Sequence, residues 1–242
     1  MTHFHRYPEL TSTNTELSRL ADEGAPHGTC VSCHTQTAGR GQRGNTWESL
    51  PGANATLSIL LRPQGIHPRS QFCISEAVAL AVAQTLDHYL PPSLAPEVKW
   101  PNDIYVGNSK ICGILIENRI SATSIDRSIA GIGVNINQPR FLSDAPNPVS
   151  LLQLTGRTHS VTEFEQRLAE AVLANAEIAP TLHPLYMDRL WRRHGLHPYI
   201  EPGSSTPFMA SIVNVAPTGH ITLRRADGTL STYAFKEISA IL

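Results

Sequence analysis

The stretch KWPNDIYVGNSKICGILIE, residues 99–117, predicts two antiparallel strands joined by a tight turn. Gly107-Asn108 separates two runs rich in β-branched and aromatic residues, which is a strong short-range signal for a two-residue hairpin. The run Ile111–Ile116 is mostly apolar. The hairpin therefore belongs to a buried sheet and not to an exposed loop.

A turn at residues 107–108 also determines which residues face each other. The expected cross-strand pairs are Val106 with Ser109, Tyr105 with Lys110, and Asp103 with Cys112. Asp103 and Lys110 would then lie diagonally on one face of the sheet, roughly 7–8 Å apart. That separation is too long for an ion pair, and it suits two side chains that hold the two ends of one reacting group.

Helices and strands follow one another on both sides of this hairpin. A capping-box pattern, Thr13-Asn-Thr-Glu16, predicts a helix that ends at about Glu23, before Gly24. The other expected elements are strands at 55–61 and 128–137, and helices at about 70–89, 149–154, 162–178 and 182–194. Together they indicate an α+β fold in which helices pack on a mixed or antiparallel sheet.

The chain changes character at about Gly195. From there to Leu242 it consists of short β-rich runs separated by turns such as Thr218-Gly219 and Asp227-Gly228. Such a stretch suits a small antiparallel barrel. We therefore expect two domains, residues 1–194 and residues 195–242.

Composition and charge restrict the class of protein. Hydrophobic residues make up 41% of the 242 residues, which is enough for a packed core, and no apolar run approaches the roughly 20 residues that cross a bilayer. The start of the chain lacks the apolar stretch of a secretory signal, so we expect a cytoplasmic protein without membrane contact. The net charge of −1 provides no basic face for nucleic acid. Sixteen residues are arginine and three are lysine, a bias that we attribute mainly to codon usage.

Cys30-Val-Ser-Cys33-His34 has the spacing of a covalent haem site. That chemistry needs export to an oxidising compartment, and no export signal is visible. The segment also has the composition of a strand, in which Cys30 and Cys33 point to opposite faces. We interpret both as buried or half-buried, reduced thiols and expect neither a redox nor a zinc role.

The segment Gly39–Gly44 satisfies the pattern G-x-G-x-x-G of dinucleotide-binding proteins. That fingerprint must open a helix, whereas here Pro51-Gly52 and a strand follow, so this interpretation fails. What remains is a glycine loop that carries Arg40 and Arg43. Glycines let backbone amides approach a ligand closely, and arginines donate forked hydrogen bonds to phosphate or carboxylate.

Five motifs now occur in one order. They are Thr11-Ser-Thr-Asn14, Gln36-Thr-Ala-Gly-Arg-Gly41, Lys99–Asp103, Lys110-x-x-Gly-Ile-Leu-x-Glu117 and Gly131-Ile-Gly-Val-Asn-Ile136. In this order and spacing they closely resemble the catalytic core of biotin protein ligases. The resemblance covers roughly residues 5–155 and implies a biotin/lipoate ligase-like catalytic domain, followed by a small SH3-like β-barrel.

The resemblance also implies a role for individual residues. Three of them, Ser12, Thr13 and Asn14, would hold the ureido ring of biotin. The other residues implied to lie at biotin are Gln36, Arg40, Gly41, Gln42, Lys110, Gly113 and Gly131. The residues implied to lie at the nucleotide are Arg40, Arg43, Trp47, Lys110 and Asn135.

The chemistry of such an enzyme accounts for its charged residues. Joining a carboxylate to the α-phosphate of ATP brings two anions together, so Lys110 and Arg40, with Mg²⁺, are the expected catalytic cations. The product would be biotinyl-5'-AMP. A lysine of a biotin carboxyl carrier protein would then attack it as the neutral amine, and Asp103 is our candidate for positioning that amine.

Several points stay open or depart from the family. Many relatives carry arginine where this chain has Gln42, and Arg43 is the expected substitute. Thr11 comes too early for a preceding helix-turn-helix domain, so we expect no binding to DNA. A lipoyl or octanoyl ligase and a non-catalytic biotin or adenylate sensor are the alternatives. The sequence leaves the oligomeric state open, a homodimer included.

Overall fold

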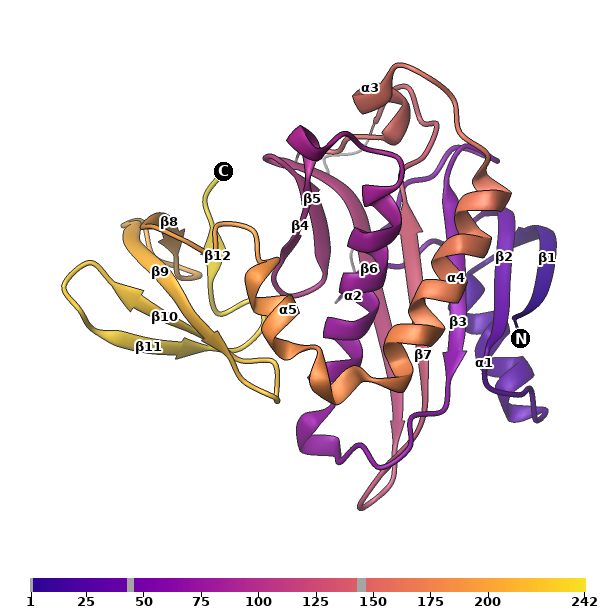
Figure 1. The fold of residues 1–242 in the computed structure, drawn as a ribbon, viewed down its shortest axis with the longest axis horizontal. Coiled ribbons are helices and arrows are strands. Elements are labelled where there is room, and N and C mark those ends of the chain that lie inside the picture. The colour runs from indigo at the N-terminus through magenta and orange to yellow at the C-terminus, as the bar shows by residue number, and fades with distance from the viewer. Residues whose placement is uncertain (1, 43–45, 143–146) are drawn as a thin grey trace.

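The computed structural model describes residues 2–42, 46–142 and 147–242. A seven-stranded sheet forms the larger part, with the strand order β1-β2-β3-β7-β6-β5-β4, and a five-stranded sheet lies at the C-terminal end, with the order β11-β10-β9-β8-β12 (Figure 1). Among the strands that lie in these described ranges, β1 and β2 pair in parallel and the other pairs are antiparallel. The expected α+β class and small C-terminal β-structure are therefore confirmed.

The elements have the following bounds. The large sheet contains β1 (His3–Leu10), β2 (Thr29–Gln36), β3 (Ala55–Leu61), β4 (Pro96–Lys99), β5 (Asp103–Val106), β6 (Ser109–Ile120) and β7 (Ile125–Val134). The C-terminal sheet contains β8 (His197–Ile200), β9 (Phe208–Val215), β10 (Ile221–Arg225), β11 (Leu230–Tyr233) and β12 (Ser239–Ala240). The helices are α1 (Thr13–Asp22), α2 (Phe72–Asp87), α3 (Leu151–Thr155), α4 (Val161–Glu177) and α5 (His183–Asp188).

Helices cover both faces of the large sheet. In Figure 1, α2 and α4 lie side by side in front of it, over the main hydrophobic core. On the other face α1 covers a smaller cluster. The strand β3 shows why both faces are apolar: Ile59 and Leu61 pack in the main core, whereas Leu60 packs under α1. Successive side chains of a strand point to opposite faces, so a strand that is covered on both sides is mostly apolar along its whole length.

The hairpin at residues 99–117 forms as the sequence predicts, with one correction. Val106 pairs with Ser109, and Tyr105 pairs with Lys110. Asp103 faces Gly113 and not Cys112, because a bulge shifts the register after Ile104. The extra residue lies on β6, and a bulge of this kind also increases the local twist.

The N-terminus of α1 differs from the expected capping box. Ser12 is the N-cap and makes no side-chain capping bond, and Thr13 is the first helical residue. Both side chains are buried at the edge of a cavity. The hydroxyl of Thr13 bonds to distant residues instead of to its own helix, which local sequence rules do not reveal.

Other differences concern element ends and edges. The expected helix at 182–194 is much shorter, because α5 ends at Asp188. The two edge strands of the large sheet, β1 and β4, are absent from the sequence-based expectation. No described helix combines the length and the apolarity that spanning a membrane requires.

The C-terminal sheet packs against the large sheet through aromatic side chains. The Nε1 of Trp100 donates to the carbonyl of Gly219 (2.9 Å). The ring of Phe235 lies 5.4 Å from Trp100 and 6.2 Å from Phe72, measured between centroids. The two sheets therefore share an interface, and the main hydrophobic core extends across it.

Candidate active site

A cavity of about 890 Å³ lies between the large sheet and the C-terminal sheet. Its volume is near the upper end of the range for small-molecule sites. It is lined by 13 of the 14 residues that the sequence predicts for the site, which come from the start of α1, the end of β2, the glycine loop and its flank, the β5–β6 hairpin and the C-terminal half of β7 with the residue that follows it. These 13 are Ser12, Thr13, Asn14, Gln36, Arg40, Gly41, Gln42, Trp47, Asp103, Lys110, Gly113, Gly131 and Asn135. The fourteenth, Arg43, lies outside the described residues.

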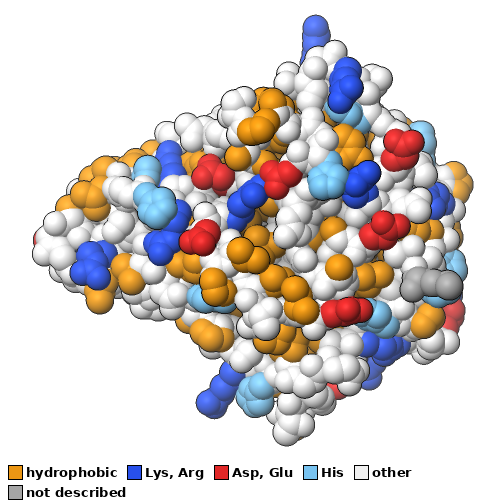
Figure 2. Space-filling view, in the orientation of Figure 1, with side chains coloured by type: hydrophobic (Ala, Val, Ile, Leu, Met, Phe, Trp, Pro, Cys, Tyr) orange, Lys and Arg blue, Asp and Glu red, His pale blue; other side chains and the backbone are white. Residues whose placement is uncertain are grey.

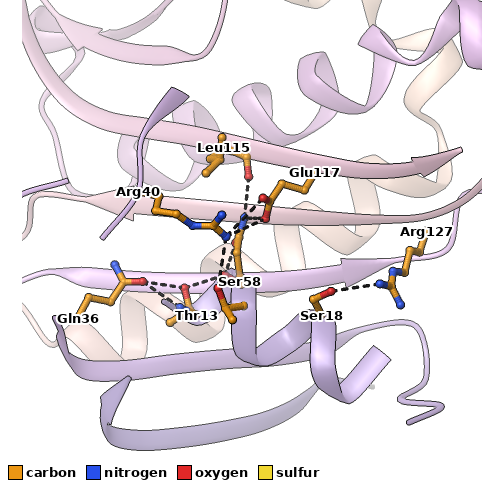
Figure 3. A network of polar contacts seen from close by, with 10 residues as sticks. Thr13, Ser18, Gln36, Arg40, Ser58, Leu115, Glu117 and Arg127 are labelled. Atoms are coloured by element: carbon orange, nitrogen blue, oxygen red, sulfur yellow. Dashed lines mark hydrogen bonds and ion pairs between the residues drawn. The ribbon is translucent and has the colours of Figure 1, made fainter. Parts of the chain in front are cut away.

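The amide of Asn14 is oriented by a hydrogen-bonded network with Ser58, Leu115 and Glu117, which Figure 3 labels. Its Nδ2 donates to an oxygen of Glu117 (2.7 Å) and to the carbonyl of Leu115 (3.3 Å). Its Oδ1 accepts from the hydroxyl of Ser58 (2.6 Å). Glu117 and Ser58 therefore fix the amide of Asn14, at one end of the cavity, in a single orientation.

Gln36 completes this end of the cavity. Its Oε1 accepts from the backbone N–H of Thr13 (2.9 Å) and from the hydroxyl of Thr13 (3.3 Å). Because the oxygen is engaged, the Nε2 of Gln36 remains as a donor. In the described part of the chain the hydroxyl of Ser12 has no partner, and this residue also lines the cavity. This end thus presents neutral donors and acceptors, which suit an uncharged polar group.

Glycines on β6 and β7 make room for side chains of the protein itself. A Cβ atom on Gly131 would lie 2.3 Å from the Oδ1 of Asn14. A Cβ on Gly133 would lie 2.4 Å from the indole of Trp47, and Gly113, its cross-strand partner, borders the same indole. The three glycines therefore allow Asn14 and Trp47 to lie directly on the sheet.

Lys110 and Asp103 form an ion pair, with the Nζ 2.7 Å from the Oδ1. The expectation that these groups lie too far apart for an ion pair is wrong. The bulge changes the register between their strands, and the flexible lysine stem spans the remaining distance. The two side chains are 25% and 19% exposed, so the pair borders the cavity and is accessible to a ligand.

The guanidinium of Arg40 lies at the other side of the Asn14 network. Its Nη2 is 3.4 Å from a carboxylate oxygen of Glu117 and 3.4 Å from the hydroxyl of Thr15. Figure 3 shows Arg40 pointing toward Glu117. One carboxylate therefore holds both the Asn14 amide and the Arg40 guanidinium.

Comparisons with known proteins agree with this geometry. Residues 7–137 match the model of the biotin/lipoate A/B protein ligase family. The chain belongs to this family. A bifunctional ligase/repressor BirA of Bacillus subtilis is 35% identical over 136 residues, which are 56% of this chain and 41% of the relative. A biotin–[acetyl-CoA-carboxylase] ligase of Paracoccus denitrificans is 34% identical over 164 residues, 66% of this chain and 67% of the relative.

Solved structures of the family show the same fold. The biotin protein ligase of Aquifex aeolicus in complex with biotin and ATP has a TM-score of 0.79 to this chain at 21% identity. The matched region covers 100% of this chain and 99% of the Aquifex chain. The chain spans about two-fifths of the length of the Bacillus relatives that it matches.

Three further residues shape the site of this family member, and the sequence analysis gave none of them a role. Ser58 and Glu117 fix the Asn14 amide, and Gly133 seats Trp47. Gly133 had a detectable signal, because it lies two residues after Gly131 and therefore on the same face of its strand. Ser58 had none, because a serine in a mostly apolar strand does not indicate which distant residue it will contact.

Lys99 is a second lysine of the cavity and, like Lys110, it is partly buried. Its Nζ donates to the hydroxyl of Tyr105 (3.1 Å) and lies 4.6 Å from the centre of that ring. Burial lowers the pKa of the Lys99 ammonium, and the nearby carboxylate of Asp103 opposes that shift.

The cysteines of the C-x-x-C-H segment are free thiols in the interior of β2. Burial raises the pKa of Cys30 to about 12 and also raises that of Cys33. Cys30 packs in the main core, whereas Cys33 contacts the hydroxyl of Thr56. In the described part of the chain, no three histidine, cysteine or acidic side chains gather as a metal site.

Proposed function

We propose that this chain is an ATP-dependent biotin ligase. It forms biotinyl-5'-AMP from biotin and ATP, and then transfers biotin to a lysine of a biotin carboxyl carrier domain. The observation that supports this best is the placement of a neutral hydrogen-bonding cluster and an accessible lysine–aspartate pair in one cavity. The cluster suits the uncharged head of biotin, and the lysine suits the carboxylate that reacts.

The neutral cluster matches the ureido ring in its hydrogen-bonding groups. The ring has one carbonyl acceptor and two N–H donors. The Nε2 of Gln36 and the hydroxyl of Ser12 are available as donors, and hydroxyl oxygens can accept from the N–H groups. A site without a fixed charge here avoids leaving a buried ion unpaired.

The adenylation step requires cations where negative charge concentrates. Lys110 would turn from Asp103 toward the biotin carboxylate and the α-phosphate, and Arg40 would turn from Glu117 toward the same anions. Both cations are therefore held by a carboxylate that can release them. Magnesium would enter with ATP, largely coordinated by phosphate and water.

The transfer step would use the aspartate that Lys110 releases. Once the ammonium of Lys110 contacts the phosphate, the carboxylate of Asp103 can accept a hydrogen bond from the attacking amine. The amine nitrogen attacks the acyl carbon and gives up a proton, which the carboxylate of Asp103 can accept and pass to solvent. The bond between the acyl carbon and the phosphate oxygen breaks, and AMP leaves. The Paracoccus relative is named for acetyl-CoA carboxylase, so the biotin carrier domain of that enzyme is the partner that we propose.

Diphosphate release tests the proposal. The chain is incubated with ATP and biotin, lipoate or octanoate in parallel, and diphosphate is measured. Biotin-dependent release supports the biotin ligase. Equal release with lipoate would favour a lipoyl ligase of the same family, and binding of biotin without release would favour a sensor. Mass spectrometry of an added carrier domain, with its target lysine replaced by arginine as the control, tests the transfer step.

A further inference from the structure

All three lysines of the chain line the active-site cavity. They are Lys99, Lys110 and Lys236, and of the arginines that the structure describes only Arg40 joins them. Lysines are normally scattered over a protein surface as solvated charges. Codon usage accounts for the scarcity of lysine in this chain, but not for the position of the lysines that remain.

Lys236 reaches the cavity from the opposite wall. It lies between β11 and β12 of the C-terminal sheet and is exposed, directly after Phe235, whose ring contacts Trp100 of the large sheet. The backbone of Lys236 has a φ of +68°, a left-handed conformation that favours glycine. A lysine in such a position costs backbone energy, which points to a use for its side chain.

Lys236 also differs from the other two lysines in its partners. Lys110 is paired with Asp103, and Lys99 donates to Tyr105. Within residues 2–42, 46–142 and 147–242, no hydrogen bond or ion pair engages the ammonium of Lys236. An unpaired cation that faces a shared cavity attracts anions.

The order of groups along the cavity indicates which anion this is. Asn14 of the neutral cluster lies on Gly131, and Lys110 borders Gly113, at the next cross-strand pair on the same face of β6 and β7. We place the biotin head at Asn14, so the carboxylate and the α-phosphate would meet near Lys110. ATP brings two more phosphates beyond the α-phosphate, and the reaction releases them as diphosphate. Among the described residues of the C-terminal sheet, Lys236 is the cation that borders the cavity.

We propose that Lys236 binds the β- and γ-phosphates of ATP and then the diphosphate leaving group. This inference rests on the proposed function. It makes the C-terminal sheet a second wall of the nucleotide site. Since the β- and γ-phosphates are absent from biotinyl-5'-AMP, Lys236 acts in adenylation and has no role in the transfer of biotin.

Three variants of Lys236 and one control variant test this inference in the full chain. Lys236→Met removes the charge, Lys236→Arg retains it, and Lys236→Gly removes it while relieving the left-handed backbone. Arg224→Gln is the matched control, because Arg224 is an exposed cation of the same sheet, on β10, and does not line the cavity. The measurements are the Kd of inorganic diphosphate, the KM values for ATP and biotin, and the rate of transfer from supplied biotinyl-5'-AMP.

We expect Lys236→Met and Lys236→Gly to weaken diphosphate binding and to raise the KM for ATP about tenfold, the effect of one lost charge-assisted contact. The KM for biotin and the transfer rate should stay unchanged. Lys236→Arg and Arg224→Gln should behave like the parent chain. The Tm of Lys236→Gly should equal or exceed that of the parent, which excludes loss of folding as the cause.

Other results would overturn the inference. Unchanged diphosphate binding in both uncharged variants would show that Lys236 does not contact phosphate. Slower transfer with an unchanged KM for ATP would place Lys236 at the carrier domain instead. If the parent chain binds diphosphate through Lys236 but forms no biotinyl-5'-AMP, the proposed function fails while the phosphate site remains.

Discussion

At the scale of single residues, the contact between Gly131 and Asn14 explains why a glycine is needed on β7. The Oδ1 of Asn14 occupies the space where a Cβ of residue 131 would lie, 2.3 Å away. Two partners, Ser58 and Glu117, hold that amide in place. A methyl group at residue 131 would therefore push Asn14 out of its network, because the amide is held from both ends.

We therefore predict that Gly131→Ala raises the KM for biotin about tenfold or more, in line with an overpacking cost of roughly 1–3 kcal/mol. A double-mutant cycle with Asn14→Ala separates the causes, since the shorter side chain leaves room for the added methyl group. In the Asn14→Ala background, Gly131→Ala should have little further effect on the KM. Equal effects in both backgrounds would show that residue 131 contacts the ligand itself.

A second prediction at this scale concerns Lys110, the cation that we propose for the adenylation step. Lys110→Gln keeps most of the alkyl stem and removes the charge, so adenylation in a single turnover should slow by roughly 10²–10³, or about 3–4 kcal/mol. The Tm should move little, because the ion pair with Asp103 is partly exposed. Transfer from supplied biotinyl-5'-AMP should suffer less, since the carboxylate is already joined to phosphate. Adenylation at the parent rate would make Lys110 a structural residue.

Sequence reasoning selected residues that the structure brings to one cavity, but it did not predict all of their contacts. The turn at residues 107–108 and the pairing of Tyr105 with Lys110 follow from local turn chemistry, and the structure confirms them. The predicted cross-strand pairing of Asp103 with Cys112 is wrong, because the packing of the whole sheet determines where a bulge forms. The prediction that Thr13 caps its helix is also wrong, because its hydroxyl bonds to Ser58 and Gln36, which are far away in the sequence.

At the scale of elements, burial on two faces makes a strand easy to predict, and an edge position makes it difficult. The strand β3 is buried along its whole length and was predicted with its observed bounds. The edge strand β1 contains Pro8 and alternates irregularly between exposed and intermediate residues. Proline is tolerated there because an edge strand has unpaired backbone groups on one side. Such a strand is specified by its neighbour β2 more than by its own pattern.

The packing of α4 on the sheet buries an acidic side chain, which leads to a prediction about pH. Glu165 is 4% exposed, and burial raises its pKa to about 7, against the opposing effects of Arg6 and Ser32. Its folded pKa lies above the unfolded value of 4.5. The folded state therefore holds the extra proton between about pH 4.5 and 7, so this group makes the protein less stable as the pH rises through that window.

We predict that Glu165→Gln stabilises the protein at pH 8 and has little effect near pH 4.5. The size of the gain at pH 8 is of the order of 3 kcal/mol, from the pKa difference. Urea unfolding at several pH values measures it. The control is Glu170→Gln, an exposed position on the same helix, which should show no such pH dependence. A gain that is equal at pH 5 and pH 8 would exclude titration of Glu165 as the cause.

At the scale of the whole molecule, the cavity exists because two sheets meet. The motifs in the sequence identified one wall, since the residues of that wall lie in five short segments with recognisable chemistry. They did not identify the other wall, where Tyr199, Ile221 and Phe235 are ordinary core residues of a small sheet. Their contribution depends on how the C-terminal sheet docks, which no local pattern encodes.

On the face shown in Figure 2, acidic and basic side chains are interspersed, and the apolar side chains lie between them.

Docking of the C-terminal sheet depends on a close contact at Gly219. This residue has a φ of +91°, and a Cβ here would lie 2.8 Å from the ring of Phe72. Gly228 is a matched control, because its φ is +90° and a Cβ there would meet nothing within 4 Å. Both Gly→Ala changes place alanine in the left-handed region, at a cost of about 1–3 kcal/mol each. Only the change at Gly219 also disturbs the interface between the sheets.

We therefore predict that Gly219→Ala lowers the free energy of unfolding more than Gly228→Ala does, by about 1–3 kcal/mol of additional overpacking cost.

Limited proteolysis can test whether the two sheets separate. Two arginines lie in the segment between α5 and β8, and each donates to a carbonyl of the C-terminal part: Arg192 to Ile241 (2.6 Å) and Arg193 to Ile212 (2.7 Å). If the sheet separates from Phe72, these bonds weaken and trypsin should cleave after the arginines faster. Limited proteolysis of the folded variants measures this directly. Gly228→Ala is the control, because it has the same backbone cost without the contact to Phe72. Faster cleavage in Gly219→Ala alone would assign the effect to docking of the C-terminal sheet. Equal cleavage in both variants would show that the contact with Phe72 does not hold the two sheets together.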